Sequence, residues 1–147
     1  MTETPRHSVS VAGIVVNDEG KVLVIRRRDN GHWEPPGGVL EMSETFEEGT
    51  RREVLEETGI AVRVDRLTGV YKNMERGIVA LVFRCFPLDE PSCATEEAAE
   101  VRWMTLNETF ESMLPAYAVR VSDAFELGVH TRAHDGINIV LTDGAAH

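Results

Sequence analysis

Residues 38–60 constrain this chain more than any other segment, because they predict a helix of defined length and composition. Thr45 is followed three residues later by Glu48, and this capping-box pattern predicts that a helix begins near Phe46. Gly59 stands where we expect the helix to end, since glycine readily adopts the left-handed conformation of a C-terminal cap. The predicted helix is about 13 residues long, which is ordinary for a globular domain.

Three glutamates of this predicted helix share one strip of its surface. At about 100° per residue, Glu53 and Glu57 lie about 40° apart, and Glu56 lies about 60° to the other side of Glu53. Like charges at this spacing repel one another unless a cation neutralises them. A solvated acidic face is one interpretation. However, Gly49 and Val54 share the sector of Glu53 and Glu57, so these two carboxylates point toward the packed side, where they are costly unless paired or bound to a cation.

The charge of the chain favours a cation at this segment. The formal net charge is −10, which argues against nucleic acid or an anionic membrane as the main partner. Residues 38–60 alone contain seven glutamates and only two arginines. Such a segment repels phosphate, but a divalent metal ion would be attracted by the carboxylates and would in turn attract phosphate.

The same segment resembles the signature of the Nudix hydrolase family, Gly-x5-Glu-x7-Arg-Glu-U-x-Glu-Glu-x-Gly-U, where U is aliphatic. Every defined position of that signature is matched. Residues 33–38 are also similar to the family's Trp-Glu-Leu-Pro-Gly-Gly, with Pro35 in place of leucine. The resemblance is sharp over residues 33–60 and vague after about residue 105. It implies the α/β class, as a Nudix-type α/β/α sandwich with a mixed sheet, and the short chain is most similar to MutT-like members.

The resemblance implies an enzyme. The expected activity is that of a pyrophosphohydrolase, in which water attacks the diphosphate linkage of a nucleoside triphosphate or another nucleoside diphosphate derivative. The expected partner is therefore a small-molecule nucleotide. The alternative is a non-catalytic Nudix module that senses a ligand or binds a protein, and the intact signature glutamates favour the enzyme. Mg²⁺ suits carboxylate, carbonyl and phosphate oxygens, and Mn²⁺ is a plausible substitute.

The resemblance also implies ligands for the metal. Carboxylates of the signature and one backbone carbonyl are expected to bind it, and the family often supplies a further acid before the strand that ends at Trp103. A solvated loop is the alternative for that further acid. The expected ligands are Glu53, Glu56, Glu57, the Gly38 carbonyl, Glu97 and Glu100.

Catalytic roles follow from the same positions, and the predicted set is Glu53, Glu56, Glu57, Arg52 and Glu44. Arg52 and Glu44 are expected to form a pair that braces the loop against the helix. The alternative for Arg52 is an exposed ion pair of little energetic value. Glu53 is the first candidate for the general base that takes the proton of the attacking water. The two acids near Trp103 are the other candidates.

Three further residues are candidates for substrate contacts. Arg27 ends an apolar strand, and alternation places it on the opposite face from Arg26 and Arg28, so it is a candidate phosphate ligand. A solvated charge at the end of a strand is the alternative. Trp33 and Tyr71 could stack on a nucleobase, although buried aromatic residues are commoner.

The whole chain, residues 1–147, is expected to form one domain with a flexible start at residues 1–7. One mixed sheet covered by helices suits the order of the elements. Residues 132–136 read as a surface turn. Strands are expected at residues 8–16, 21–25, 60–71, 77–86, 100–104 and 137–141, with one or two helices over residues 106–127 interrupted at Pro115.

The remaining features predict a cytoplasmic protein. No apolar run approaches the ~18 residues of a membrane span, and the polar start is not a signal peptide. Cys85 and Cys93 are the only cysteines, and Cys85 ends an apolar run, so a reduced core cysteine is favoured over a disulfide or a metal site. A homodimer is compatible with the resemblance, but nothing in the sequence requires one.

Overall fold

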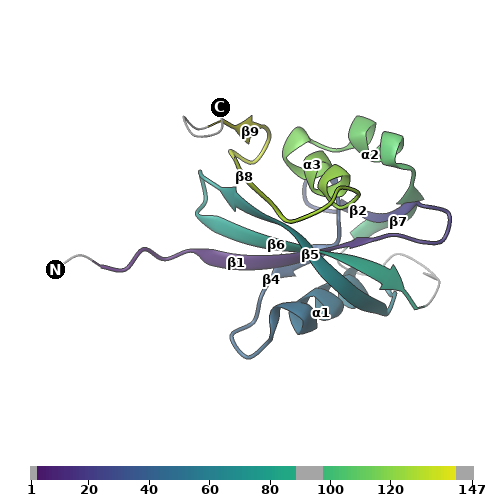
Figure 1. The fold of residues 1–147 in the computed structure, drawn as a ribbon, viewed down its shortest axis with the longest axis horizontal. Coiled ribbons are helices and arrows are strands. Elements are labelled where there is room, and N and C mark those ends of the chain that lie inside the picture. Colours follow the sequence, from purple (N-terminus) through teal and green to yellow (C-terminus); the bar gives the residue numbers. More distant parts are fainter. Residues whose placement is uncertain (1–2, 89–97, 142–147) are drawn as a thin grey trace.

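The computed structural model describes residues 3–88 and 98–141, which contain two β-sheets and three helices (Figure 1). The larger sheet has six strands in the order β4-β1-β6-β5-β8-β9. Its strands are β1 (Ser8–Val15), β4 (Gly37–Val39), β5 (Val62–Asn73), β6 (Ile78–Pro87), β8 (His130–His134) and β9 (Ile139–Val140). The smaller sheet, in the order β3-β2-β7, consists of β3 (Trp33–Glu34), β2 (Val22–Arg27) and β7 (Ala98–Met104). The helices are α1 (Phe46–Thr58), α2 (Leu106–Ser112) and α3 (Pro115–Asp123).

The larger sheet is mixed, as predicted. Strand β1 runs parallel to β6, and β5 runs parallel to β8, while the other pairs are antiparallel. The expectation of a single sheet was wrong. Both edges of β1 are occupied, by β4 and by β6, so β2 cannot continue that sheet and pairs with β3 and β7 instead.

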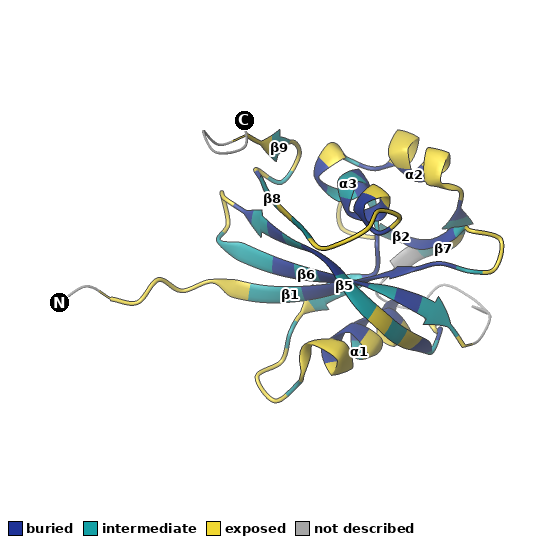
Figure 2. Cartoon of the chain, in the orientation of Figure 1, coloured by how far each residue is buried: buried dark blue, intermediate teal, exposed yellow. Residues whose placement is uncertain are grey.

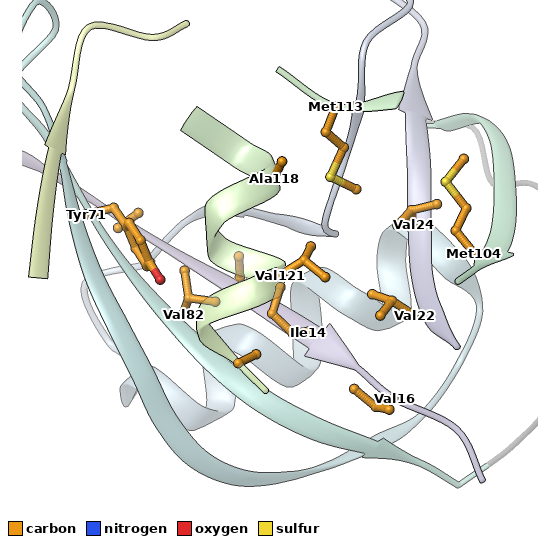
Figure 3. Close-up of a cluster of buried hydrophobic side chains, with 13 residues drawn as sticks. Ile14, Val16, Val22, Val24, Tyr71, Val82, Met104, Met113, Ala118 and Val121 are labelled. Carbon is orange, nitrogen blue, oxygen red and sulfur yellow. The ribbon is translucent and has the colours of Figure 1, made fainter. Parts of the chain in front are cut away.

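Helices cover both faces of the larger sheet (Figure 1), which gives the predicted α/β/α arrangement. Consecutive residues of β1 belong to different buried clusters: Ile14 packs on the side of α3, and Val15 packs on the side of α1. Figure 3 shows the first cluster, in which Ile14 and Val82 lie beside Val121 of α3. A strand buried on both faces reads as a continuous apolar run rather than an alternating one.

Helix α1 begins and ends where the sequence predicts. The Thr45 hydroxyl accepts a hydrogen bond from the backbone N–H of Glu48 at 3.2 Å, and the Glu48 carboxylate accepts one from the backbone N–H of Thr45 at 2.9 Å. Gly59 closes the helix in the left-handed conformation, with φ of 75°. Figure 2 shows the outer side of α1 exposed, while Glu53 and Glu57 are buried on its inner side.

The C-terminal third confirms one prediction and corrects another. Pro115 separates the two helices, because it opens α3 at a position where proline is tolerated. Residues 132–136 are not simply a surface turn. Residues 130–134 form β8, which runs parallel to β5, and His134 is only 1% exposed. The missed strand is short and polar, so it lacks the apolar alternation by which strands are predicted.

The structure also bears on the N-terminal residues, the cysteines and the expected absence of a membrane span. Residues 3–7 are exposed and belong to no helix or strand. Cys85 is a free, buried thiol, and burial raises its pKa to about 12, as befits an unreactive core cysteine. Cys93 lies outside the described residues. Within residues 3–88 and 98–141, no helix combines the length and the apolar character that a membrane span requires.

Candidate active site

The buried carboxylates of α1 face the glycines of β4. Glu53 is 9% exposed and Glu57 is 5% exposed. The backbone N–H of Gly37 donates to Glu57 Oε1 at 2.6 Å, which ties the helix to the strand. A Cβ atom on Gly38 would lie 2.6 Å from the Glu53 carboxylate, closer than side-chain atoms approach one another. Glycine at position 38 therefore makes room for the Glu53 carboxylate.

Arg52 connects the carboxylates of the site. Its Nε and Nη2 donate to the two oxygens of Glu44 at 2.6 and 2.8 Å, so the predicted pair forms as a bidentate contact. Its Nη1 donates to Glu53 at 2.8 Å and to Glu56 at 3.3 Å, and its Nη2 also donates to the carbonyl of Val39 at 3.1 Å. The hydrogen bond from Arg52 lowers the pKa of Glu44 to about 2. Arg52 thus braces the segment before α1 against the helix.

The predicted metal ligands share a strip of α1 but do not converge. Among the described residues, no three acidic, histidine or cysteine side chains lie close enough together to hold a metal ion. Glu56 is half exposed, and the cation beside Glu53 and Glu56 is Arg52. The donor chemistry nevertheless fits a hard divalent cation: three carboxylates on one helix face and a backbone carbonyl at Gly38 offer only oxygen. Two of those carboxylates are buried, where a cation is most favourable.

Two further acids near Trp103, Glu97 and Glu100, were expected as metal ligands, and the structure describes only Glu100. Glu100 lies on β7, in the smaller sheet, where it forms ion pairs with Arg26 at 3.4 Å and with Arg102. It does not form a metal-binding group with the glutamates of α1. Its backbone is paired with Arg26 of β2, the residue with which its side chain forms one of these ion pairs. Glu97 lies outside the described residues.

A cavity of about 360 Å³ opens beside the two glycines of β4. It is bounded by β1, β3, β4 and β6, by the ends of β2 and β5 and the segments after them, and by α3 and β8. Arg27 lines it, as expected of a substrate contact, although its guanidinium is already paired with Asp29 at 2.9 Å and with Glu34 at 3.2 Å. Burial raises the pKa of Glu34 despite its contact with Arg27. The role of Arg27 toward substrate stays a prediction.

The structure does not bring the two aromatic candidates to this cavity. Tyr71 is fully buried, and its hydroxyl donates to Asp123 at 2.7 Å, so the prediction that it stacks on a nucleobase was wrong. Trp33 is half buried against the core, and the guanidinium of Arg102 lies 4.9 Å from its ring centroid. The ring is thus occupied by protein contacts and is not part of the cavity wall.

Sequence reasoning missed a cluster on the far wall of the cavity. Tyr117 and Arg120 come from α3, His134 from β8 and Asn73 from the end of β5. These residues belong to no motif and are far apart in sequence. The available signals were weak: a basic residue within an apolar helix, and a histidine in a late polar segment. The parallel pairing of β5 with β8 places Asn73 opposite His134, and the contacts of Arg120 with Tyr71 and His134 bring α3 to the same place.

A NUDIX domain family model matches residues 6–125. The chain belongs to the Nudix family. A MutT-like protein of Streptomyces ambofaciens is 56% identical over 140 residues, which cover 95% of this chain and 91% of that protein. An ADP-ribose pyrophosphatase of Methanocaldococcus jannaschii is 36% identical over 107 residues, covering 68% of this chain and 63% of that protein.

The fold of this Nudix chain agrees with solved structures. A NUDIX hydrolase from Nitrosomonas europaea superposes with a TM-score of 0.76, covers 90% of this chain and 82% of its own, and is 24% identical. At that identity the likeness concerns the fold alone. Family membership confirms the sequence prediction of a Nudix hydrolase of the pyrophosphohydrolase class.

Proposed function

We propose that this Nudix chain is a Mg²⁺-dependent hydrolase that cleaves the diphosphate linkage of a nucleoside triphosphate or another nucleoside diphosphate derivative. The observation that carries the proposal is the pair of buried carboxylates, Glu53 and Glu57, held against Gly37 and Gly38, two glycines that also line a cavity. The similarity to a protein named ADP-ribose pyrophosphatase supports a nucleotide of this class.

The residues that would hold the metal are Glu53, Glu56, Glu57 and the carbonyl of Gly38. Mg²⁺, or Mn²⁺ in its place, would supply stabilisation of the charge on the phosphate oxygens and would make a bound water more acidic. Glu56 is the half-exposed member of the set, so its side chain is the one freest to turn toward the other two.

The chain's own residues then position the reaction. Arg52, fixed by Glu44, donates to Oε1 of Glu53 at 2.8 Å and holds that carboxylate beside Gly38. A carboxylate held at this position is suited to take the proton of the attacking water, so Glu53 is our first candidate for the general base. Glu97 and Glu100 stay the alternatives. The backbone N–H of Gly37 orients Glu57.

The test is a panel assay for released phosphate, pyrophosphate or nucleoside monophosphate, with and without Mg²⁺. The panel contains nucleoside triphosphates, ADP-ribose, NADH, dinucleoside polyphosphates and nucleotide sugars. Glu57→Gln removes a buried carboxylate, and Glu47→Gln removes an exposed carboxylate from the same helix as a matched control. We expect turnover that needs Mg²⁺, falls at least about 100-fold in Glu57→Gln and is unchanged in Glu47→Gln.

Two results would contradict the proposal. Turnover that persists in Glu57→Gln would move the metal site away from α1. Tight binding of one nucleotide without turnover would support the non-catalytic sensing module instead. The cytoplasmic location and the homodimer stay predictions.

A further inference from the structure

Arg120 is a buried cation on the wall of the cavity, and none of the acidic residues that the structure describes forms an ion pair with it. It is 7% exposed, and within the described part of the chain its Nε has no hydrogen-bond partner. The rings of Tyr71 and Tyr117 lie 5.1 and 4.7 Å from its guanidinium carbon. Such cation–π contacts position the group but leave its charge unneutralised. A buried charge of this kind is costly until an anion reaches it.

His134 adds a second donor at the same place. A neutral imidazole has one acceptor nitrogen and one N–H. Nδ1 accepts the backbone N–H of Gly136 at 3.0 Å, which places the proton on Nε2. That Nε2 lies 3.2 Å from Nη2 of Arg120, so two donors face each other there. Burial and the charge of Arg120 lower the pKa of His134, which keeps the ring neutral. An oxygen placed beside both groups would accept from each.

The rest of the cavity does not supply that oxygen. Glu34 attracts Arg120 electrostatically, but Glu34 and Asp29, the two carboxylates of the lining, both accept hydrogen bonds from Arg27. Asn73 uses its carbonyl oxygen to accept two backbone N–H groups of the following turn, at 3.0 and 3.1 Å, which leaves its amide nitrogen as a third donor. Arg76 also lines the cavity and, among the described residues, has no ion pair. This wall is rich in donors and positive charge in a chain whose net charge is −10.

We propose that Arg120 and His134 select substrates that carry a second anionic group, a phosphate or a carboxylate, remote from the diphosphate that is cleaved. The inference rests on the proposed function, because the same cavity also contacts Gly37 and Gly38, beside the catalytic carboxylates. An anionic oxygen satisfies both donors and neutralises Arg120. A neutral acceptor, such as a nucleobase carbonyl, would accept hydrogen bonds from both groups but would leave the buried charge of Arg120 unpaired.

Matched substrate pairs test this selection. UDP-glucuronate differs from UDP-glucose by a carboxylate, and NADPH differs from NADH by a phosphate, so the two pairs separate the two sources of charge. In the wild type with Mg²⁺ we expect the anionic member of one pair to have a kcat/KM roughly 10- to 100-fold higher, mainly through a lower KM, as a charge-assisted hydrogen bond allows.

Variants assign the preference to Arg120. Arg120→Gln should abolish it, and Arg120→Lys should retain part of it because the charge remains. Arg84→Gln is the matched control, since Arg84 also has a buried Nε with no hydrogen-bond partner among the described residues but lies on β6, outside the cavity wall. The control should keep the preference of the wild type.

The outcomes separate this inference from the proposed function. Equal kcat/KM for both members of both pairs overturns the selection of an anion and leaves the hydrolase intact. Absence of all Mg²⁺-dependent turnover overturns the proposed function, and titration of inorganic phosphate in EDTA by calorimetry then decides the inference. Saturable binding at millimolar phosphate supports it, and no binding overturns it. If Arg120→Gln does not fold, the wild-type comparison and the phosphate titration still decide.

Discussion

At the scale of single residues, Gly38 is the position where the smallest change should affect activity most. A methyl group there would lie 2.6 Å from the Glu53 carboxylate, which Arg52 holds in place, so Gly38→Ala should push the carboxylate out of position. We expect kcat to fall at least about tenfold while the melting temperature changes little. Val39→Ala, on the same strand and exposed, is the control. Full activity in Gly38→Ala would show that Glu53 has freedom to move.

Asp123 is the residue whose loss should most weaken the α3 side of the core. Its buried carboxylate accepts hydrogen bonds from Nε and Nη2 of Arg132, at 2.7 and 2.8 Å, and from the hydroxyl of Tyr71, at 2.7 Å. Asp123→Asn leaves the arginine without its partner, and we expect a loss of about 3 kcal/mol in the free energy of unfolding. Tyr71→Phe removes one neutral donor and should cost about 1 kcal/mol. Urea denaturation measures both, and equal losses would contradict this ranking.

These residues show which contacts a sequence can disclose. The pairing of Arg52 with Glu44 was predicted because both belong to a motif with fixed spacing. Burial was the commoner expectation for Tyr71, but its hydrogen bond to Asp123 was not predicted, because Asp123 stands 52 positions away on another element. Arg120 was missed for the same reason: its neighbours come from β5 and β8, and no local pattern connects them.

At the scale of elements, the two capping boxes allow a matched comparison. Thr45 caps α1 and Thr105 caps α2, and each makes the same reciprocal bonds with a glutamate three residues on. Each Thr→Ala change should cost about 1 kcal/mol in the free energy of unfolding. Because α1 carries Glu53, Glu56 and Glu57, only Thr45→Ala should also weaken Mg²⁺-dependent turnover. A loss of turnover in Thr105→Ala of equal size would contradict a local effect.

The elements that were predicted well are those fixed by neighbouring residues. Helix α1 carries its start and stop signals in its own sequence, and both were confirmed. Strand β8 depends on pairing with β5, some 60 residues earlier, and its sequence is too polar to indicate burial. The division into two sheets likewise depends on which strands occupy the edges of β1, and hydrophobic periodicity does not report that.

At the scale of the whole molecule, acidification should destabilise the fold in two stages. Burial lowers the pKa of His134 below its ordinary value of about 6.5, so the folded state favours the neutral ring. Its contribution to stability is therefore complete above pH ~6.5 and is lost as pH falls toward the folded pKa.

The second stage comes from Asp123. Burial opposes ionisation of its carboxyl group, but hydrogen bonds from Arg132 and Tyr71 outweigh burial and lower the pKa of Asp123. Its contribution is complete above pH ~4 and is lost below.

The first stage can be isolated by comparing unfolding curves between pH 7.5 and pH 5. Glu34 acts in the opposite direction, because its raised pKa stabilises the fold more as pH falls, so the wild-type profile alone mixes several groups. The difference between wild type and His134→Gln cancels those common contributions. We expect this difference in the free energy of unfolding to shrink as pH falls below about 6.5. A constant difference for His134→Gln would mean that the buried ring accepts a proton as readily as in the unfolded chain.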